Sequence, residues 1–242
     1  MKRFYILFLS VLCICSCADK FSGTSDTLGT GNGVLSVGIL GDSISTYEGY
    51  IDSSYKSYYP RIQDGVRADV DDWTKTYWGI LLQEYWHAEL DVNASWSGTC
   101  ITPRSDFKTD FLTRAGTFGN PDIIIVNGGT NDYLKRPQKG GTVTPEDYRT
   151  AYRNLLSFLK GKYPRALIII VIGDFVKLDY GDISKETADE FGLPCVDFRQ
   201  DSKNIGKVFD EKTNPHPNAS GMRFMAEKIY NQTKSTVESL NK

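Results

Sequence analysis

The chain has 242 residues, of which 40% are hydrophobic, 24% charged and 12% aromatic. A chain of this length and composition can bury a large core, which excludes a disordered chain and a small disulfide-dense fold. Its 28 basic and 30 acidic side chains give a formal net charge of −2. We expect no nucleic-acid partner, because such a protein carries an excess of basic residues that contact phosphates.

The amino-terminal segment has the pattern of an export signal. Two basic residues precede an apolar run at residues 4–15, which is too short to span a bilayer because a membrane helix needs about 20 apolar residues. The sequence Ile-Cys-Ser-Cys at the end of this run resembles the lipobox of bacterial lipoproteins. It implies a signal peptide over residues 1–16 and lipidation of Cys17; a signal peptide cleaved elsewhere is the alternative. We expect a protein exported to the bacterial cell envelope, periplasmic or surface-exposed, that contacts the membrane through this anchor only.

Residues 17–33 are rich in Gly, Ser and Thr and lack apolar periodicity, so we expect a flexible tether there. Residues 34–242 show no internal repeat and no mid-chain linker, which favours a single folded domain. Two cysteines remain in this domain, Cys100 and Cys195, which either pair in an oxidising compartment or stay free and buried. With only two histidines and no four-cysteine spacing in the chain, we expect no metal site and no cofactor.

Apolar runs alternate with helical patterns along the folded part. Continuous apolar runs predict buried strands, and apolar residues at helical spacing predict amphipathic helices. In chain order we expect a strand at residues 34–40, a helix at 74–90, strands at 91–94 and 122–127, a helix at 145–163, a strand at 166–172, a helix at 184–191, a strand at 194–198 and a helix at 219–240. Thr144 is the expected N-cap of the helix at 145–163. This alternation predicts a mostly parallel sheet with helices on both faces.

Two connections, residues 47–72 and 133–144, are long for such a domain, and long connections are usually functional loops. The first contains five tyrosines: Tyr47, Tyr50, Tyr55, Tyr58 and Tyr59. These rings either form an aromatic rim that stacks on sugars, with Tyr47 and Tyr50 as candidate substrate-binding residues, or simply cover the edge of the core.

Polar residues follow the predicted strands at their carboxyl ends, where ligands bind in open α/β sheets. Ser43 follows the first strand within Gly-Asp-Ser, and Gly98 lies after the second. Asn131 follows the 122–127 strand within Gly-Gly-Thr-Asn-Asp, and His216 lies just before the last helix. Each segment taken alone is more simply explained as a turn, a loop or a helix lead-in.

Together and in this order, the four segments resemble the SGNH superfamily of esterases, also called GDSL hydrolases. The family is named after a serine, a glycine, an asparagine and a histidine in four separated blocks. Here the first block reads Gly-Asp-Ser-Ile, with Ile where the family often has Leu, and the third is a full Gly-x-Asn-Asp. The resemblance spans about residues 35–226. It implies a three-layer α/β/α sandwich with a mostly parallel, flavodoxin-like sheet.

The resemblance also implies ester hydrolysis through an acyl-serine. Ser43 would be the nucleophile and His216 the general base, since His87 lies inside a helical pattern. The backbone N–H groups of Ser43 and Gly98 and the side-chain amide of Asn131 would form the oxyanion hole.

The sequence departs from the family at the group that orients the histidine. The family usually has an aspartate three residues before this histidine, and here Thr213 occupies that position. Asp210 or another carboxylate could replace it, a backbone carbonyl could hold the ring of His216 instead, or the enzyme could be impaired. Asp42 and Asp132 are expected to brace their turns rather than to react.

We therefore expect a serine esterase that removes short acyl groups, such as acetyl, from glycans. The expected envelope location, the tyrosine-rich loop and the lack of an extended apolar lid motivate this substrate class. The alternative is a lipoprotein of the same fold that has lost turnover and binds carbohydrate. A nucleotide-binding protein is disfavoured, because the Gly-Asp-Ser turn has neither the Gly-x-Gly-x-x-Gly pattern nor a Gly-Lys-Ser/Thr phosphate loop.

Overall fold

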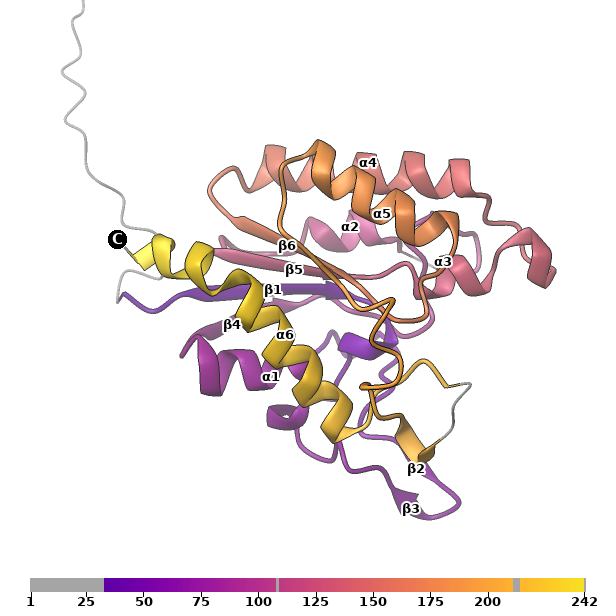
Figure 1. Cartoon of the computed structure of the whole chain (residues 1–242), viewed down its shortest axis with the longest axis horizontal. Coiled ribbons are helices and arrows are strands. Elements are labelled where there is room, and N and C mark those ends of the chain that lie inside the picture. The colour runs from indigo at the N-terminus through magenta and orange to yellow at the C-terminus, as the bar shows by residue number, and fades with distance from the viewer. Residues whose placement is uncertain (1–32, 108, 211–213, 242) are drawn as a thin grey trace, which may run out of the picture.

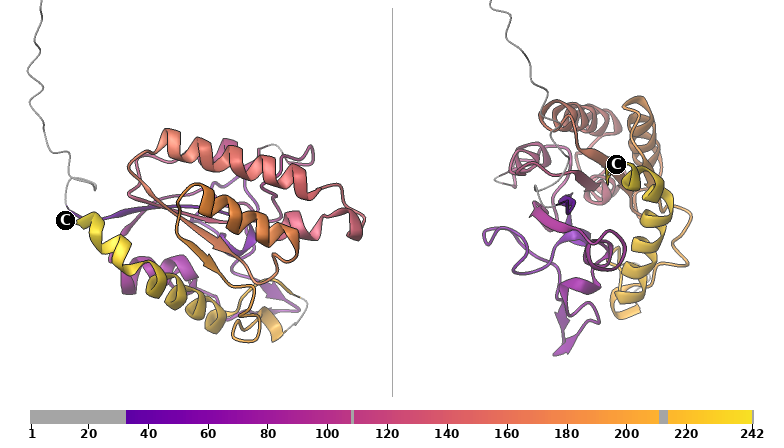
Figure 2. Two further views of the ribbon diagram at one scale, coloured as in Figure 1. Left: turned by 45° about the horizontal axis from the view of Figure 1, so that its top comes forward. Right: turned by 90° about the vertical axis from the view of Figure 1, so that its left-hand side faces the viewer.

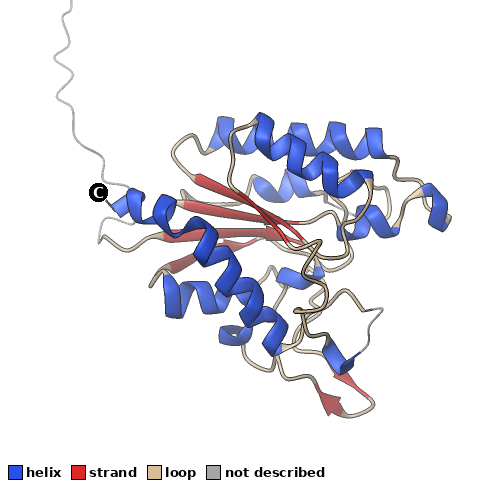
Figure 3. Ribbon diagram, in the orientation of Figure 1, coloured by secondary structure: helices blue, strands red, loops and turns tan. Residues whose placement is uncertain are grey.

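Five parallel strands form the central sheet of this computed structural model, which describes residues 33–107, 109–210 and 214–241. They are β1 (Ser36–Gly41), β4 (Glu89–Asn93), β5 (Ile123–Asn127), β6 (Leu167–Ile172) and β7 (Cys195–Asp197), drawn in red in Figure 3. All residues of β1 and β5 are buried, as expected for strands that are covered on both faces. Each of the five strands lies within or next to an apolar run that predicted it.

The strand order β4-β1-β5-β6-β7 is the flavodoxin-like order 2-1-3-4-5 when the five strands are numbered along the chain. β4, the next strand of this sheet along the chain, lies on one side of β1, and β5, the strand after it, lies on the other side. The carboxyl ends of β1 and β5 therefore form a topological switch point, where folds of this type bind their ligands. The predicted parallel, flavodoxin-like sheet is confirmed.

Helices cover both faces of the sheet and complete three layers (Figure 1, Figure 2). One face carries α1 (Tyr77–Ile80), the π-helical turn η3 (Leu81–Tyr85) and α6 (Ala219–Glu238), and the other carries α2 (Phe111–Ala115), α4 (Pro145–Lys162) and α5 (Asp179–Glu190). The short helix α3 (Thr130–Leu134) follows β5 at the carboxyl edge of the sheet. Thr144 caps α4 as predicted, with its side chain accepting a hydrogen bond from the Asp147 N–H.

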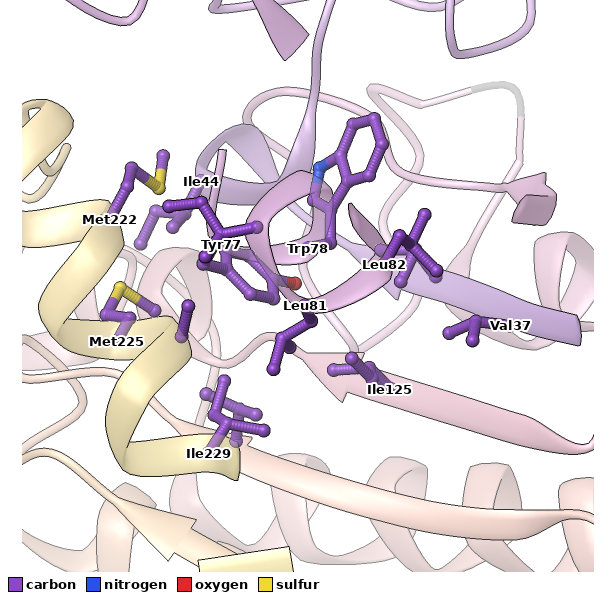
Figure 4. Close-up of a cluster of buried hydrophobic side chains, with 14 of the residues drawn as sticks. Val37, Ile44, Tyr77, Trp78, Leu81, Leu82, Ile125, Met222, Met225 and Ile229 are labelled. Carbon is purple, nitrogen blue, oxygen red and sulfur yellow. The ribbon is translucent and has the colours of Figure 1, made fainter. Parts of the chain in front are cut away.

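The core consists of two apolar clusters separated by the sheet. Successive side chains of a strand point to opposite faces, so Ile125 belongs to the cluster under α1 and α6, whereas Val126 belongs to the cluster under α4. Figure 4 shows the first cluster, where Met225 of α6 faces Tyr77 and Leu81 across the layer. Burial of these side chains on both faces fixes the position of every strand end.

The helix expected at residues 74–90 is shorter than predicted, and its last residues belong to β4. A 3-10 turn (Trp73–Lys75) precedes α1, and the helical segment ends with η3. His87 then adopts a left-handed backbone with φ of 48°, which a continuing helix does not allow, and β4 starts at Glu89. His87 is exposed and lies outside any helix, contrary to the expectation. The helix expected at residues 184–191 starts earlier, because α5 begins at Asp179.

The two cysteines of the folded domain do not form a disulfide. Cys100 is buried, Cys195 is half-buried, and both are free thiols.

The long loop at residues 47–72 contains a small antiparallel hairpin of β2 (Ile62–Gln63) and β3 (Val66–Arg67). None of the helices in the described ranges is long and apolar enough to cross a membrane. The predicted signal peptide, the lipidation at Cys17 and nearly all of the tether lie outside those ranges.

Candidate active site

Ser43 lies at the carboxyl end of β1, as the first residue of the 3-10 turn η1 (Ser43–Ser45). The buried Asp42 caps this turn, because its Oδ1 accepts a hydrogen bond from the Ile44 N–H at 3.1 Å. A side chain at Gly41 would place its Cβ 2.4 Å from the Ser45 Oγ, so the turn requires glycine there. These contacts hold Ser43 at the switch point with its side chain facing the histidine loop.

His216 meets Ser43 at this point, although 173 positions separate them in the sequence. The His216 Nε2 lies 2.8 Å from the Ser43 Oγ, and the His216 Nδ1 lies 2.5 Å from the Asn214 Oδ1. The same Oδ1 accepts the backbone N–H of His216 at 3.0 Å, which identifies it as the amide oxygen because a backbone N–H only donates. Nδ1 therefore carries the proton, and Nε2 is the ring atom that accepts the Ser43 hydroxyl.

Asn214 is the group that orients the imidazole, and the sequence analysis missed it. The partner is neither a carboxylate nor a backbone carbonyl but a side-chain amide. Thr213 and the side chain of Asp210 lie outside the described residues. A signal was present: Asn-Pro-His allows an Asx turn, in which an asparagine oxygen accepts the N–H two residues later. That turn places the same oxygen beside the ring.

The tyrosine-rich loop supports the histidine from the other side. The Tyr58 ring stacks on His216 at 3.5 Å between centroids and 6° between planes. The Asn214 Nδ2 donates to the Tyr58 hydroxyl at 3.3 Å, and the Tyr59 hydroxyl donates to the Pro217 carbonyl at 2.7 Å. Two elements far apart in sequence thus hold the ring of His216 in one plane.

Two other tyrosines of the loop, Tyr47 and Tyr59, cover the edge of the core, which is one of the two expected roles. Tyr47 is buried, and its hydroxyl donates to the Asp71 carbonyl at 2.7 Å. Tyr50 stacks on Trp73 at 5.0 Å between centroids. Tyr47 and Tyr59 therefore cover the core, and within the described residues neither Tyr47 nor Tyr50 forms a hydrogen bond or ring contact with Ser43 or His216.

The environment of His216 favours its neutral form. Burial of the ring, together with the nearby positive charges of Lys207 and Arg61, lowers the pKa of His216 to about 3. The partner of Nδ1, Asn214, is uncharged, and within the described residues no carboxylate contacts this nitrogen. The ring is therefore a neutral acceptor at any pH well above that value, which a general base requires.

The three hydrogen-bond donors predicted for the oxyanion hole differ in how far their hydrogens are already engaged. Within the described residues, the backbone N–H groups of Ser43 and Gly98 have no acceptor. Gly98 holds a φ of 85°, a conformation suited to glycine. The Asn131 Nδ2, from α3, donates to the Thr99 carbonyl at 3.0 Å, and its other contact, to the Asp42 Oδ2, is long at 3.5 Å. One amide hydrogen is thus fully engaged and the second only weakly.

Two buried charged residues hold this donor set in place. Asp132 accepts hydrogen bonds from the Ile101 and Thr102 N–H groups, both at 2.9 Å, and so braces the segment after Gly98 as expected. Arg114 of α2 has no exposed surface and donates to three acceptors: the carbonyls of Gly41 and Ala94 and the hydroxyl of Thr99. These acceptors lie at the ends of β1 and β4 and beside Asn131. Sequence spacing gave no sign of this role.

Burial shifts the pKa values of Asp42 and Arg114, two charged groups near Ser43. Desolvation raises the pKa of Asp42 to about 7, although the hydrogen bond from the Ile44 N–H opposes the shift. Desolvation also lowers the pKa of Arg114 to about 10, which leaves it charged at neutral pH. Arg114 thus places a positive charge beside the segments that carry these N–H donors, and a positive charge stabilises a nearby negative oxygen.

Comparisons with known proteins agree with this geometry. A family model described as GDSL-like lipase/acylhydrolase matches residues 35–233. Among solved structures, a GDSL-like lipase from Bacteroides ovatus is 27% identical with a TM-score of 0.68, and the match covers 84% of this chain and 99% of that chain. A second, from Bacteroides uniformis, is 26% identical with a TM-score of 0.70, covering 85% and 98%.

A family two carbohydrate esterase from Clostridium thermocellum, in complex with cellohexaose, shares the fold at 20% identity and a TM-score of 0.61. That match covers 85% of this chain and 66% of the esterase chain. None of the curated proteins is significantly similar in sequence. The family match spans most of the chain, so the protein belongs to the GDSL-like lipase/acylhydrolase family and is an ester hydrolase.

Proposed function

We propose that this protein is a serine esterase that works through an acyl-serine intermediate. The observation that carries the proposal is the chain of contacts Ser43 Oγ, His216 Nε2, His216 Nδ1 and Asn214 Oδ1, at 2.8 and 2.5 Å. It pairs a hydroxyl with a neutral base whose second nitrogen is held by an acceptor, which is the arrangement that activates a serine.

The reaction divides into two acyl transfers. The Ser43 Oγ attacks the ester carbonyl carbon while the His216 Nε2 takes the hydroxyl proton, and the N–H groups of Ser43, Gly98 and Asn131 stabilise the negative oxygen. Collapse of this intermediate breaks the ester C–O bond, and the imidazolium returns the proton to the departing alcohol. A water molecule, deprotonated by His216, then attacks the acyl-serine and releases the carboxylic acid.

The substrate class we propose is a glycan that carries short acyl groups such as acetyl. An aromatic wall beside Gly98 supports it: Tyr55 and Trp96 stack at 4.6 Å with 8° between their planes, and Phe107 packs edge-on against Trp96 at 5.4 Å. Partly exposed aromatic faces suit the apolar faces of sugar rings. The complex of the Clostridium thermocellum esterase with cellohexaose supports the same class.

Export and lipidation remain part of the proposal on sequence grounds. Residues 1–16 would be removed as a signal peptide, Cys17 would carry the lipid, and residues 34–242 would form the hydrolase domain at the cell envelope. The lipobox-like Ile-Cys-Ser-Cys supports this placement. Radiolabelled palmitate incorporation in the wild type, and its loss in Cys17→Ala, would test it.

The test of the reaction is Ser43→Ala against the wild type on short p-nitrophenyl esters and acetylated oligosaccharides. We expect kcat to fall by at least about 10³-fold, because removing a serine nucleophile alone abolishes nearly all triad catalysis. Ser45→Ala is a matched control, since Ser45 lies in the same turn but its hydroxyl contacts the Tyr77 hydroxyl at 2.7 Å. Equal hydrolysis by wild type and Ser43→Ala would remove Ser43 as the nucleophile.

A carbohydrate-binding lipoprotein without turnover is the second candidate. The uncharged Asn214 at Nδ1 favours it, because no carboxylate stabilises an imidazolium there. A fluorophosphonate probe separates the two candidates. Stoichiometric labelling of Ser43 supports the esterase, whereas binding of oligosaccharides without labelling supports the binding protein.

A further inference from the structure

A second cavity lies at the carboxyl edge of the sheet, beside the histidine loop. Its volume is about 580 Å³, and its walls come from the segments that follow β6 and β7. Three lysines, Lys177, Lys203 and Lys207, line it together with one carboxylate, Asp174, and the ring of Phe175. A volume of this size falls within the range of small-molecule sites, roughly 300–1,000 Å³.

The charges of the cavity do not balance. The Lys207 Nζ is bonded to both carboxylate oxygens of Asp174, at 2.9 and 2.8 Å, and both side chains are buried, so this pair is neutral as a unit. Lys177 and Lys203 are exposed at the cavity, and within the described residues neither forms an ion pair. Lys177 and Lys203 therefore give the cavity an excess of two positive charges, although the whole chain has a net charge of −2.

The cavity wall is joined directly to the catalytic loop. The Lys207 Nζ also donates to the carbonyl of Pro215, the residue between Asn214 and His216, at 3.3 Å. One residue further along, the Val208 N–H donates to the carbonyl of His216 at 3.0 Å. The cavity therefore adjoins the loop that carries His216.

We propose that this cavity is a subsite for a negatively charged sugar unit, adjacent to the unit that carries the acyl group. The anion is a carboxylate, as in a uronic acid, or a sulfate ester, and the ammonium groups of Lys177 and Lys203 bind it. Phe175 is half-buried, with the Lys207 and Lys177 ammonium groups 4.9 and 6.0 Å from its ring centroid, and offers an apolar surface to the ring of that sugar. The inference rests on the proposed esterase function and adds a preference for acidic glycans.

The test compares two double variants with the same change in net charge. Lys177→Gln with Lys203→Gln removes the excess charge of the cavity. Lys160→Gln with Lys234→Gln removes two charges near the carboxyl ends of α4 and α6, at the opposite edge of the sheet. Each is assayed on acetylated oligogalacturonate, on an acetylated sulfated oligosaccharide and on neutral acetylated xylo-oligosaccharide.

We expect the cavity variant to lose roughly fivefold to tenfold in kcat/KM on an anionic substrate, mainly through KM, and to keep its activity on the neutral one. The loss should shrink at high salt, because salt screens exposed charges. The arm that shows the loss, uronate or sulfate, identifies the anion. Equal effects of the two double variants, or an equal loss on the neutral substrate, would overturn the subsite.

Binding separates this inference from the esterase proposal. Calorimetry with Ser43→Ala measures the affinity for unacetylated oligogalacturonate and xylo-oligosaccharide, with and without the two lysine changes. Lysine-dependent binding of the acidic sugar without any esterase activity in the wild type keeps the subsite and removes the esterase. Esterase activity with no charge preference in binding or rate does the reverse.

Discussion

Around Ser43, buried charged side chains hold the backbone, whereas the imidazole of His216 is itself positioned by an amide and an aromatic ring. Asp132 and Arg114 are both completely buried and between them bind five groups of the nucleophile side. Asn214 and Tyr58, by contrast, are partly exposed, and neither is a carboxylate or a cationic side chain.

The two sides of the site therefore differ in kind: charged groups hold the Ser43 side, whereas uncharged groups position the ring of His216. Buried charged hydrogen bonds are strong and specific in geometry, so the donors near Ser43 are preorganised for a negative oxygen. The base side provides the correct tautomer without a charge at Nδ1. In the proposed mechanism, the site would thus stabilise the developing anion more strongly than the developing imidazolium.

Loss of the buried guanidinium should have the largest effect. Arg114→Met leaves the Ala94 carbonyl without a donor in the interior and removes one of the two donors to the Gly41 carbonyl, which the Trp96 N–H also contacts. An unsatisfied buried group costs about 1–3 kcal/mol. We expect the free energy of unfolding to fall by about 3 kcal/mol, and kcat to fall on the order of 10²-fold because the oxyanion donors shift. Urea unfolding and ester hydrolysis measure the two effects.

Arg149→Met is the matched control, since Arg149 is exposed and pairs with Glu186 on the surface of the helical layer. We expect it to change the free energy of unfolding by less than about 1 kcal/mol and to leave kcat unchanged. Arg114→Met with the stability and kcat of the control would show that the nucleophile side does not depend on its buried charges.

Adding a charge on the base side should have a smaller and opposite effect. In Asn214→Asp, a carboxylate next to Nδ1 stabilises the imidazolium, which raises the pKa of His216 above its present value of about 3. We expect kcat at pH 8 to rise by roughly fivefold to tenfold, because a hydrogen bond to a charged partner gains about 1 kcal/mol over a neutral one. The acid limb of kcat/KM, which follows ionisation of the free enzyme, should move to higher pH.

Asn214→Ala provides the reference, because it removes the acceptor without adding charge. We expect it to lower kcat on the order of 10²-fold through loss of ring orientation. An Asn214→Asp variant whose acid limb stays in place would contradict the assignment of Nδ1 to this residue.

Substitution of Asp42 should have the smallest effect on kcat. Its clearest effect should be on the pH dependence of the free energy of unfolding. Its pKa in the folded state, about 7, lies above the unfolded value of 3.8, so the folded state binds more protons between these values. The free energy of unfolding therefore decreases as the pH rises through this window, by up to about 1 kcal/mol per pH unit. Asp42→Asn cannot ionise and should flatten the decline between pH 4 and 7 in thermal unfolding.

Asp132, whose pKa is also raised by burial, contributes a decline of the same sign and remains in the variant. The flattening should therefore be partial. A decline as steep in Asp42→Asn as in the wild type would mean that Asp42 is already ionised in the fold at low pH.

The fold was predictable where a local pattern determines the structure. Strands buried on both faces are continuous apolar runs, and β5 and β6 show this most clearly. The end of the helix before β4 was not predictable, because it depends on the left-handed backbone of His87, which no apolar spacing encodes. The early start of α5 escaped prediction because its first turn, at Asp179, is polar.

The candidate site shows the same division. Ser43, Gly98, Asn131 and His216 could be named because each lies in a short motif, and the structure brings Ser43 and His216 into hydrogen-bond contact. Arg114 could not be named, since its partner Gly41 is 73 positions away and only the packing of α2 brings them together. Tyr58 could not be singled out among the five tyrosines of its loop, of which the sequence favoured Tyr47 and Tyr50, because its role depends on the histidine loop that packs against it.

The 173 positions between Ser43 and His216 also set an order of events during synthesis. The ribosome releases the nucleophile turn early, whereas the base emerges only just before α6, whose apolar face completes the cluster shown in Figure 4. A nascent or truncated chain that ends before this helix holds a serine without its proton acceptor. In the proposed mechanism, reactivity therefore arises only when this final layer docks on the sheet.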